Sequence, residues 1–132
     1  MRTTLLLAVL LTGCWKPRRA EDPGTITCVD FDDDEVTITV VPEVCISSSC
    51  SRNYVATCTA VAEDGVIEVR TQVRWGDRVG PMGCTDDCGP GFSNVVCSTT
   101  AEPGTWTVVY GDSEVEVELP SEVSCSGFAP AP

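Results

Sequence analysis

The stretch Val66-Ile-Glu-Val-Arg-Thr-Gln-Val-Arg-Trp75 decides the fold class, because apolar and polar side chains alternate along it without a break. Successive side chains of an extended chain point to opposite faces, so one face of this stretch is apolar and the other is polar. The pattern predicts a half-buried β-strand. Residues 53–62 precede it across Glu63-Asp64-Gly65, so we expect the two segments to form a hairpin. Cys58 would then face the core together with Tyr54 and the alanines of that segment.

A second hairpin is predicted around Gly111-Asp112, because glycine in the first central position suits a tight two-residue turn. Apolar residues alternate on both sides of this turn, over 106–110 and 115–119. Weaker strand patterns cover 25–31, 35–41 and 92–98. Seven short strands with polar turns and no helical periodicity predict an all-β fold, an antiparallel sandwich over residues 25–120. A small barrel is the alternative.

The first residues form a targeting segment. One positive charge at Arg2, an apolar run over 5–11 and small residues at Thr12 and Gly13 are typical of a secretory signal peptide. The run is far shorter than the roughly 20 apolar residues that cross a bilayer as a helix. We therefore expect residues 1–13 to be removed.

The end of this segment, Leu11-Thr12-Gly13-Cys14, resembles the bacterial lipobox. The resemblance implies a lipoprotein cleaved before Cys14 and acylated there with diacylglycerol and a fatty acid such as palmitate. Several acyl chains on one residue make a durable membrane anchor. Trp15 follows the cysteine where inner-membrane lipoproteins often have Asp, which favours the outer membrane of a double-membrane bacterium. The polar segment 14–24 is predicted to be a linker, and residues 121–132 a frayed tail.

The second half of the chain resembles the ends of small bacterial lipoproteins with an immunoglobulin-like (Ig-like) sandwich. The likeness rests on the cysteines at 84, 88 and 97, on Pro103-Gly104-Thr105-Trp106 and its strand, and on Val115 to Pro120. Such proteins end in a PGTY-type strand, a turn containing glycine and a last strand. Trp106 stands where they usually have Tyr. The resemblance implies a fold and no activity.

Eight cysteines remain after Cys14, an even number that suits disulfide bonds in an exported domain. We expect four bridges, of undetermined pairing, among Cys28, Cys45, Cys50, Cys58, Cys84, Cys88, Cys97 and Cys125. Zinc would favour Cys-x2-Cys pairs, often with His, and the chain has no His. Redox exchange would favour Cys-x-x-Cys at a helix start, which is also missing. A structural role is therefore predicted.

The acidic run from Asp30 to Glu35 is the most suggestive polar feature. Asp30, Asp32 and Asp34 have the opening spacing of a calcium loop, where alternate carboxylates converge on one cation. Glu35 then stands where such a loop needs Gly, and Val41 where it needs a bidentate Glu. A solvated turn is the prediction, with no metal and no cofactor. Calcium binding by the envelope protein is the alternative.

The composition narrows the function. The formal net charge is −12, which argues against nucleic acid as a partner and against docking on anionic lipid. Without His there is no Ser-His-Asp or Cys-His arrangement, so we expect no enzyme. The predicted function is a non-catalytic structural or binding module of the cell envelope, with an unidentified partner. Its binding face would include Trp15, Trp75 or Tyr54 if these are exposed. Arg70 and Arg74 would pair with Glu114, Glu116 and Glu118 if their strands were neighbours.

Overall fold

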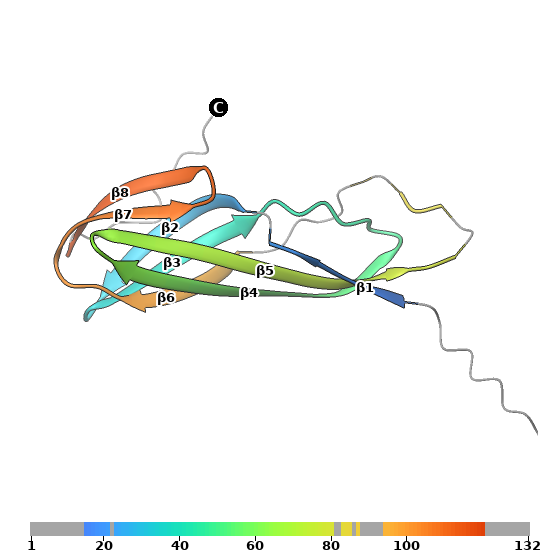
Figure 1. Cartoon of the computed structure of the whole chain (residues 1–132), viewed down its shortest axis with the longest axis horizontal. Helices are drawn as coiled ribbons and strands as arrows, with labels where there is room; N and C mark the ends of the chain where they lie inside the picture. The colour runs from blue at the N-terminus through green and yellow to red at the C-terminus, as the bar shows by residue number, and fades with distance from the viewer. Residues whose placement is uncertain (1–14, 22, 81–82, 86, 88–93, 121–132) are drawn as a thin grey trace, which may run out of the picture.

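The computed structural model describes residues 15–21, 23–80, 83–85, 87 and 94–120. These form eight β-strands in two sheets (Figure 1). The strands are β1 (Trp15–Ala20), β2 (Gly24–Asp32), β3 (Glu35–Pro42), β4 (Ser51–Glu63), β5 (Val66–Arg78), β6 (Val95–Thr100), β7 (Gly104–Tyr110) and β8 (Ser113–Leu119). The all-β prediction is confirmed for this part of the chain, but seven strands was one too few. No helix among the described residues is long and apolar enough to cross a bilayer.

The hairpins expected from the turn residues are present. In the β4–β5 turn, Asp64 and Gly65 have φ values of 50° and 79°, the two positive values of a type I′ turn. In the β7–β8 turn, Gly111 has a φ of 59° and follows Tyr110, which pairs with Ser113. Both turns match the right-handed twist of the strands they join, so they fix the register of each hairpin.

The core lies between the two sheets. The most buried side chains alternate along the strands, with Val36, Ile38 and Val40 in β3 and with Ile67 and Val69 in β5. The alternation predicted for 66–75 is therefore confirmed. The β7–β8 hairpin completes the cluster with Val108, Tyr110, Val117 and Leu119.

One strand pair departs from the expected antiparallel arrangement. β5 and β7 run parallel, and Val66 to Glu68 pair with Thr107 to Val109. The strand between them in sequence, β6, belongs to the other sheet and pairs with β3. The chain therefore leaves the first sheet after β5 and returns to it in the same direction. β8 pairs with β7 and not with β5, so the neighbouring strands needed for the proposed Arg–Glu pairing are not formed.

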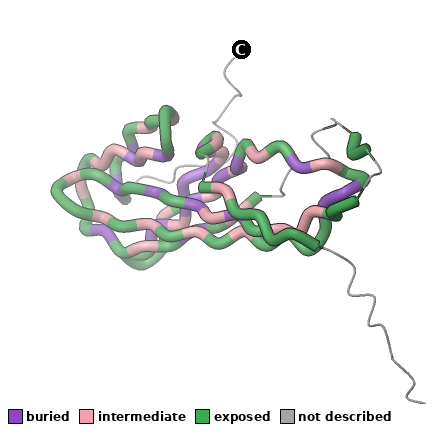
Figure 2. The backbone as a smooth tube through the Cα atoms, turned by 45° about the vertical axis from the view of Figure 1, so that its right-hand side comes forward, coloured by how far each residue is buried: buried purple, intermediate pink, exposed green. Residues whose placement is uncertain are grey.

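The β4–β5 hairpin is longer than the sandwich. Each of its strands has 13 residues, which is about 43 Å at ~3.3 Å per residue. Residues 51–56 and 73–78 extend beyond the core, and β1 pairs alongside them (Figure 1). We call these three segments the arm, and the remainder of the two sheets the sandwich. The core cluster has no member in the arm, where Ser51 and Val73 are buried and most of the other residues are exposed (Figure 2).

Candidate functional site

β1 occupies the segment that the sequence predicts to be a linker. Its residues Trp15–Ala20 pair antiparallel with residues 73–78 of β5, so the linker prediction is wrong for them. Every residue of β1 except Ala20 is exposed, and an edge strand without a buried face produces no alternating pattern. Pro17 is compatible with this position because proline is tolerated at a sheet edge.

One face of the arm contains four arginines and a tryptophan. Residues paired across strands share a face, which places Trp15 beside Arg78 and Arg19 beside Arg74. The Arg52 guanidinium lies 5.0 Å from the centre of the Trp15 ring, within cation–π range. All five side chains are exposed, Trp15 to 41%. We call Trp15, Arg19, Arg52, Arg74 and Arg78 the basic face.

Positive charge is concentrated in the arm as a whole. Of the lysines and arginines after residue 14, only Arg70 lies elsewhere. The arm strands contain a single carboxylate, Asp77. The net charge of −12 does not reveal that positive and negative charge are separated. The other acidic residues belong to the sandwich, the loops and the ends of the chain.

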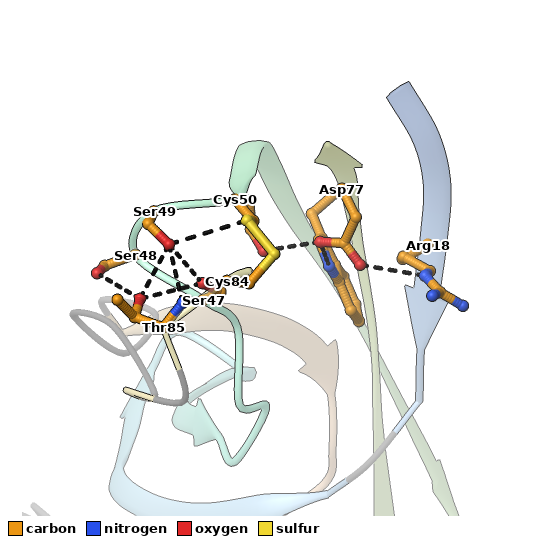
Figure 3. Close-up of a disulfide and its surroundings, with 10 residues drawn as sticks. Arg18, Ser47, Ser48, Ser49, Cys50, Asp77, Cys84 and Thr85 are labelled. Atoms are coloured by element: carbon orange, nitrogen blue, oxygen red, sulfur yellow. Dashed lines mark hydrogen bonds and ion pairs between the residues drawn. A yellow bond between two sulfur atoms is a disulfide. The ribbon is translucent and has the colours of Figure 1, made fainter. Parts of the chain in front are cut away.

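Asp77 joins the three arm strands on the face opposite the basic face. Its carboxylate accepts hydrogen bonds from Ser51 Oγ at 2.7 Å and from Trp75 Nε1 at 2.9 Å, and it pairs with Arg18 Nε at 3.1 Å (Figure 3). Ser51 is buried and Trp75 is half-buried. Because neighbouring residues of a strand point to opposite faces, Asp77 does not neutralise the basic face.

A serine-rich loop closes beside the arm. Cys50 and Cys84 form a disulfide with a Cα–Cα distance of 5.5 Å (Figure 3). Beside it, Thr85 Oγ1 lies 3.2 Å from Ser47 Oγ and 3.0 Å from Ser49 Oγ. These contacts fasten residues 47–50 to residues 83–85.

Asp87 adds to the same cluster. Its carboxylate accepts a hydrogen bond from the Ser48 hydroxyl. This bond, helped by one from Thr85, lowers the pKa of the Asp87 carboxyl below its ordinary value. The hydroxyls therefore form hydrogen bonds with a carboxylate and with one another, and these bonds hold the two segments of the loop together.

The disulfide prediction is confirmed where the cysteines are described. Cys58 in β4 bonds to Cys97 in β6, which joins the two sheets, with a Cα–Cα distance of 5.3 Å. Cys28 and Cys45 are also disulfide-bonded. Cys88, Cys125 and the predicted lipidation residue, Cys14, lie outside the described residues.

The face predicted for 53–62 holds only in part. Cys58 packs against the core as expected, together with Ala60 and Ala62. Tyr54 does not, because a β-bulge between Arg52 and Val55 interrupts the alternation, and Tyr54 is 43% exposed. Asn53, at the bulge, has a φ of 56°.

The acidic run forms a hairpin turn. Asp33 and Asp34 have φ values of 46° and 69°, so they occupy the two central positions of a type I′ turn between β2 and β3. Asp30 lies in β2, and its Oδ1 accepts a hydrogen bond from the Phe31 amide at 2.9 Å. In the part of the chain that the structure describes, which includes this whole run, no three His, Cys, Asp or Glu side chains form a group that could hold a metal ion. Asp30, Asp32 and Asp34 are therefore strand and turn residues.

A polar hollow that the sequence did not indicate lies at the edge of β5. β7 pairs with residues 66–68 and β1 with residues 73–78, so no strand of the described chain pairs with residues 69–72 on that side. The hollow there has a volume of about 560 Å³, and its lining includes Thr57, Glu68, Arg70, Gln72 and Tyr110. Glu68 and Arg70 pair with each other at 2.6 Å, so neither is a free reactive group. Two strands sharing one edge create this gap, which no local pattern signals.

Tyr110 forms a buried hydrogen bond beside this hollow. Its hydroxyl lies 2.7 Å from Thr71 Oγ1, and both residues are buried. Burial raises the pKa of the Tyr110 hydroxyl, against the effect of the Thr71 bond, and the charge of Glu43 raises it further. The pair is a structural connection between β5 and β7.

Comparison with known proteins adds no relative. No known family model, curated protein or solved structure matches the chain. The arm, with its exposed aromatic residues and separated charge, is the candidate site for interaction. Of the three aromatic residues named from the sequence, Trp15 and Tyr54 are exposed, and Trp75 is half-buried against Asp77.

Proposed function

We propose that the chain is a bacterial lipoprotein, an envelope module without catalytic activity that is held on the membrane by acyl chains on Cys14. The proposal starts from Leu11-Thr12-Gly13-Cys14 and the apolar run before it. Outer-membrane attachment is part of the proposal because Trp15 follows the cysteine. The two-sheet architecture with a disulfide between the sheets is compatible with an Ig-like domain.

The observation that supports this function best is the position of β1. Its first residue, Trp15, directly follows Cys14 and pairs with Arg78 at the end of β5. An acyl anchor on Cys14 would therefore connect to a paired strand, without a flexible spacer between them. The anchored end would be the arm, and the β4–β5 turn at the far end of the sandwich would lie about one hairpin length from the anchor.

The disulfides support a structural or binding role over a catalytic one. Cys50–Cys84 and Cys58–Cys97 stiffen the arm end and the sandwich separately. A small domain held rigid in this way presents a surface of fixed shape, which lowers the entropic cost of binding a partner. The exposed Trp15 and Tyr54 make the arm the proposed contact surface.

Mass spectrometry of the protein extracted from bacterial membranes tests the proposal. We expect a chain that begins at Cys14 and has the added mass of a diacylglycerol and a fatty acid. Cys14→Ser should abolish both the cleavage and the added mass, whereas Thr12→Ser, which keeps a small residue in the motif, should preserve them. A chain that retains residues 1–13 without acyl groups would contradict the proposal.

A further inference from the structure

We propose that the basic face docks on the anionic phospholipid headgroups of the membrane in which the protein is anchored. The inference rests on the proposed function, because the anchor on Cys14 would hold this face at the bilayer. It reverses the expectation from the net charge, since the charge that matters for docking is that of the surface presented to the lipid.

The positive charge of this face is largely uncompensated. Ion pairs among the described residues are Arg18–Asp77, Arg19–Glu21 and Arg70–Glu68. No carboxylate of the described chain lies within ion-pair distance of Arg52, Arg74 or Arg78. Arg74 donates two hydrogen bonds, at 2.9 Å and 2.6 Å, to the neutral side chain of Gln72, which leaves its charge in place. The positive charges of these three arginines therefore have no counter-ion among the described residues.

The chemistry of the face suits lipid headgroups. Arginine donates paired hydrogen bonds to phosphate oxygens, and a guanidinium stacked on an aromatic ring, as Arg52 is on Trp15, still has edge N–H groups for phosphate. Tryptophan favours the headgroup level of a bilayer, where its ring is half in apolar and half in polar surroundings. Val55, paired with Arg74 and 58% exposed, adds an apolar contact to the same face.

The position of the face directs it to the membrane of the anchor. Trp15 is one residue from Cys14, so the face begins where the acyl chains would enter the bilayer. The opposite face of the arm has two cations, Lys16 and Arg18, of which Arg18 is paired with Asp77, and it adjoins the serine-rich loop (Figure 3). The exposed acidic residues of the sandwich, such as Asp32, Asp33 and Asp34 in the β2–β3 hairpin, would be repelled from an anionic surface. Attraction at one end and repulsion at the other would orient the module.

The acylated full chain, reconstituted in vesicles, provides the test. One set of vesicles is phosphatidylcholine alone, and the other includes a substantial fraction of phosphatidylglycerol. Both contain a headgroup-labelled lipid that quenches tryptophan fluorescence. Trp15→Phe identifies the quenching that belongs to Trp15.

We expect Trp15 quenching to be stronger in the anionic vesicles and to fall when salt is raised to about 1 M, where the screening length is about 3 Å. A juxtamembrane arginine contributes about 1 kcal/mol, so Arg74→Glu should lower the ratio of docked to undocked protein at least about fivefold. Arg70→Glu is the matched control, because Arg70 is exposed on the same face of β5 but outside the arm. It should change the ratio much less.

Equal Trp15 quenching in both vesicles, unaffected by salt and by Arg74→Glu, would overturn the inference. A Trp15 response to soluble polyphosphate without any response to anionic vesicles would also overturn it and assign the face to a soluble polyanion. Flotation separates these outcomes from failure of the proposed function. An acylated chain that floats with the vesicles retains its anchor whichever way the arm behaves, whereas a chain without acyl groups that stays in solution contradicts the anchor itself.

Discussion

The sandwich and the arm share two strands and are stabilised by different interactions. Along β5, Ile67 and Val69 are buried in the sandwich, whereas Arg74 and Arg78 are exposed in the arm half of the same strand. The sandwich has two layers and an apolar core. The arm is held by backbone pairing, by the Asp77 hydrogen bonds and by the Cys50–Cys84 loop beside it.

This difference separates stability from interaction along one hairpin. Burial of apolar surface is the dominant stabilising term in a small domain, and the sandwich contains nearly all of it. Regions with few buried apolar contacts open at lower free energy, so we expect the arm to open before the sandwich. The sandwich can therefore keep the fold while the side chains of the arm face a partner.

The largest expected decrease in the free energy of unfolding follows from removal of a core side chain. Ile38, in the middle of β3, is fully buried, and Ile38→Ala should lower the free energy of unfolding by about 2–5 kcal/mol. Val55→Ala is the control in the arm, where 58% exposure predicts a change within about 0.5 kcal/mol. Urea unfolding measures both. Similar losses for the two variants would erase the contrast between the regions.

The two disulfides sharpen the contrast, because the closed loops are similar in length. Cys58 and Cys97 are 39 residues apart, and Cys50 and Cys84 are 34 apart. Loop closure alone therefore predicts comparable losses of about 2–4 kcal/mol for each pair of alanine substitutions. Cys97 belongs to the core cluster and Cys58 packs against it, whereas Cys50 is buried outside that cluster and Cys84 is exposed. C58A/C97A should therefore cost more and C50A/C84A less.

Hydrogen exchange locates the two disulfide effects. C50A/C84A should speed exchange in β1 and in residues 73–78 while β3 stays protected, whereas C58A/C97A should speed exchange in β3 and β6. Uniform acceleration by C50A/C84A across both sheets would show that arm and sandwich unfold as one unit.

The sandwich was predictable because its strands alternate. Ile67 and Val69 lie on a buried face that the alternation in the sequence indicates residue by residue, and the two turns contain glycine where positive φ is needed. The parallel β5–β7 pair was not predictable, since strand alternation specifies which face is buried and contains no information on which strand is the neighbour.

Most of the arm could not be predicted from the sequence. The segment Trp15–Ala20 has no apolar face, so its pairing with β5 is determined by tertiary contacts alone. The basic face combines Trp15 with Arg52 and Arg78, residues far apart in the chain. Exposure of Tyr54 depends on the bulge at Asn53, which the alternation before and after it conceals. The sequence did identify Trp15 and Tyr54 as contact residues on condition that they were exposed.

A smaller effect is expected at the buried hydrogen bond between the strands of the parallel pair. Tyr110→Phe leaves the Thr71 hydroxyl without its partner and should cost about 1–3 kcal/mol. Adding Thr71→Val should recover part of the loss, because both polar groups are then absent. Thermal unfolding of the two single variants and the double variant gives the coupling free energy between Tyr110 and Thr71. Additive losses would contradict the contact.

The same tyrosine predicts a pH dependence in alkali. Burial, the main cause, raises the pKa of Tyr110 in the folded protein above its ordinary value of 10.0. The unfolded chain therefore loses its proton at lower pH than the folded chain, and this contribution to stability is complete below pH 10.0 and lost as the pH rises through the folded pKa. Stability measured between neutral pH and pH 11 should fall less steeply in Tyr110→Phe. Parallel curves would contradict the shift.

The smallest effects are expected at the Asp77 carboxylate of the arm, whose hydrogen-bonding and ion-pair partners differ in exposure. Asp77→Ala removes the acceptor of Ser51 and Trp75 and should cost about 1 kcal/mol, because water replaces part of the loss at a side chain that is 27% exposed. Arg18→Ala removes a partner that is 49% exposed and should change stability by less than about 0.5 kcal/mol.

Amide exchange in β1 is the sharper measurement, since it reports the arm separately from the core. Faster exchange of β1 in Asp77→Ala than in Arg18→Ala would assign the attachment of the strand to the half-buried hydrogen bonds, and the reverse order would assign it to the surface ion pair.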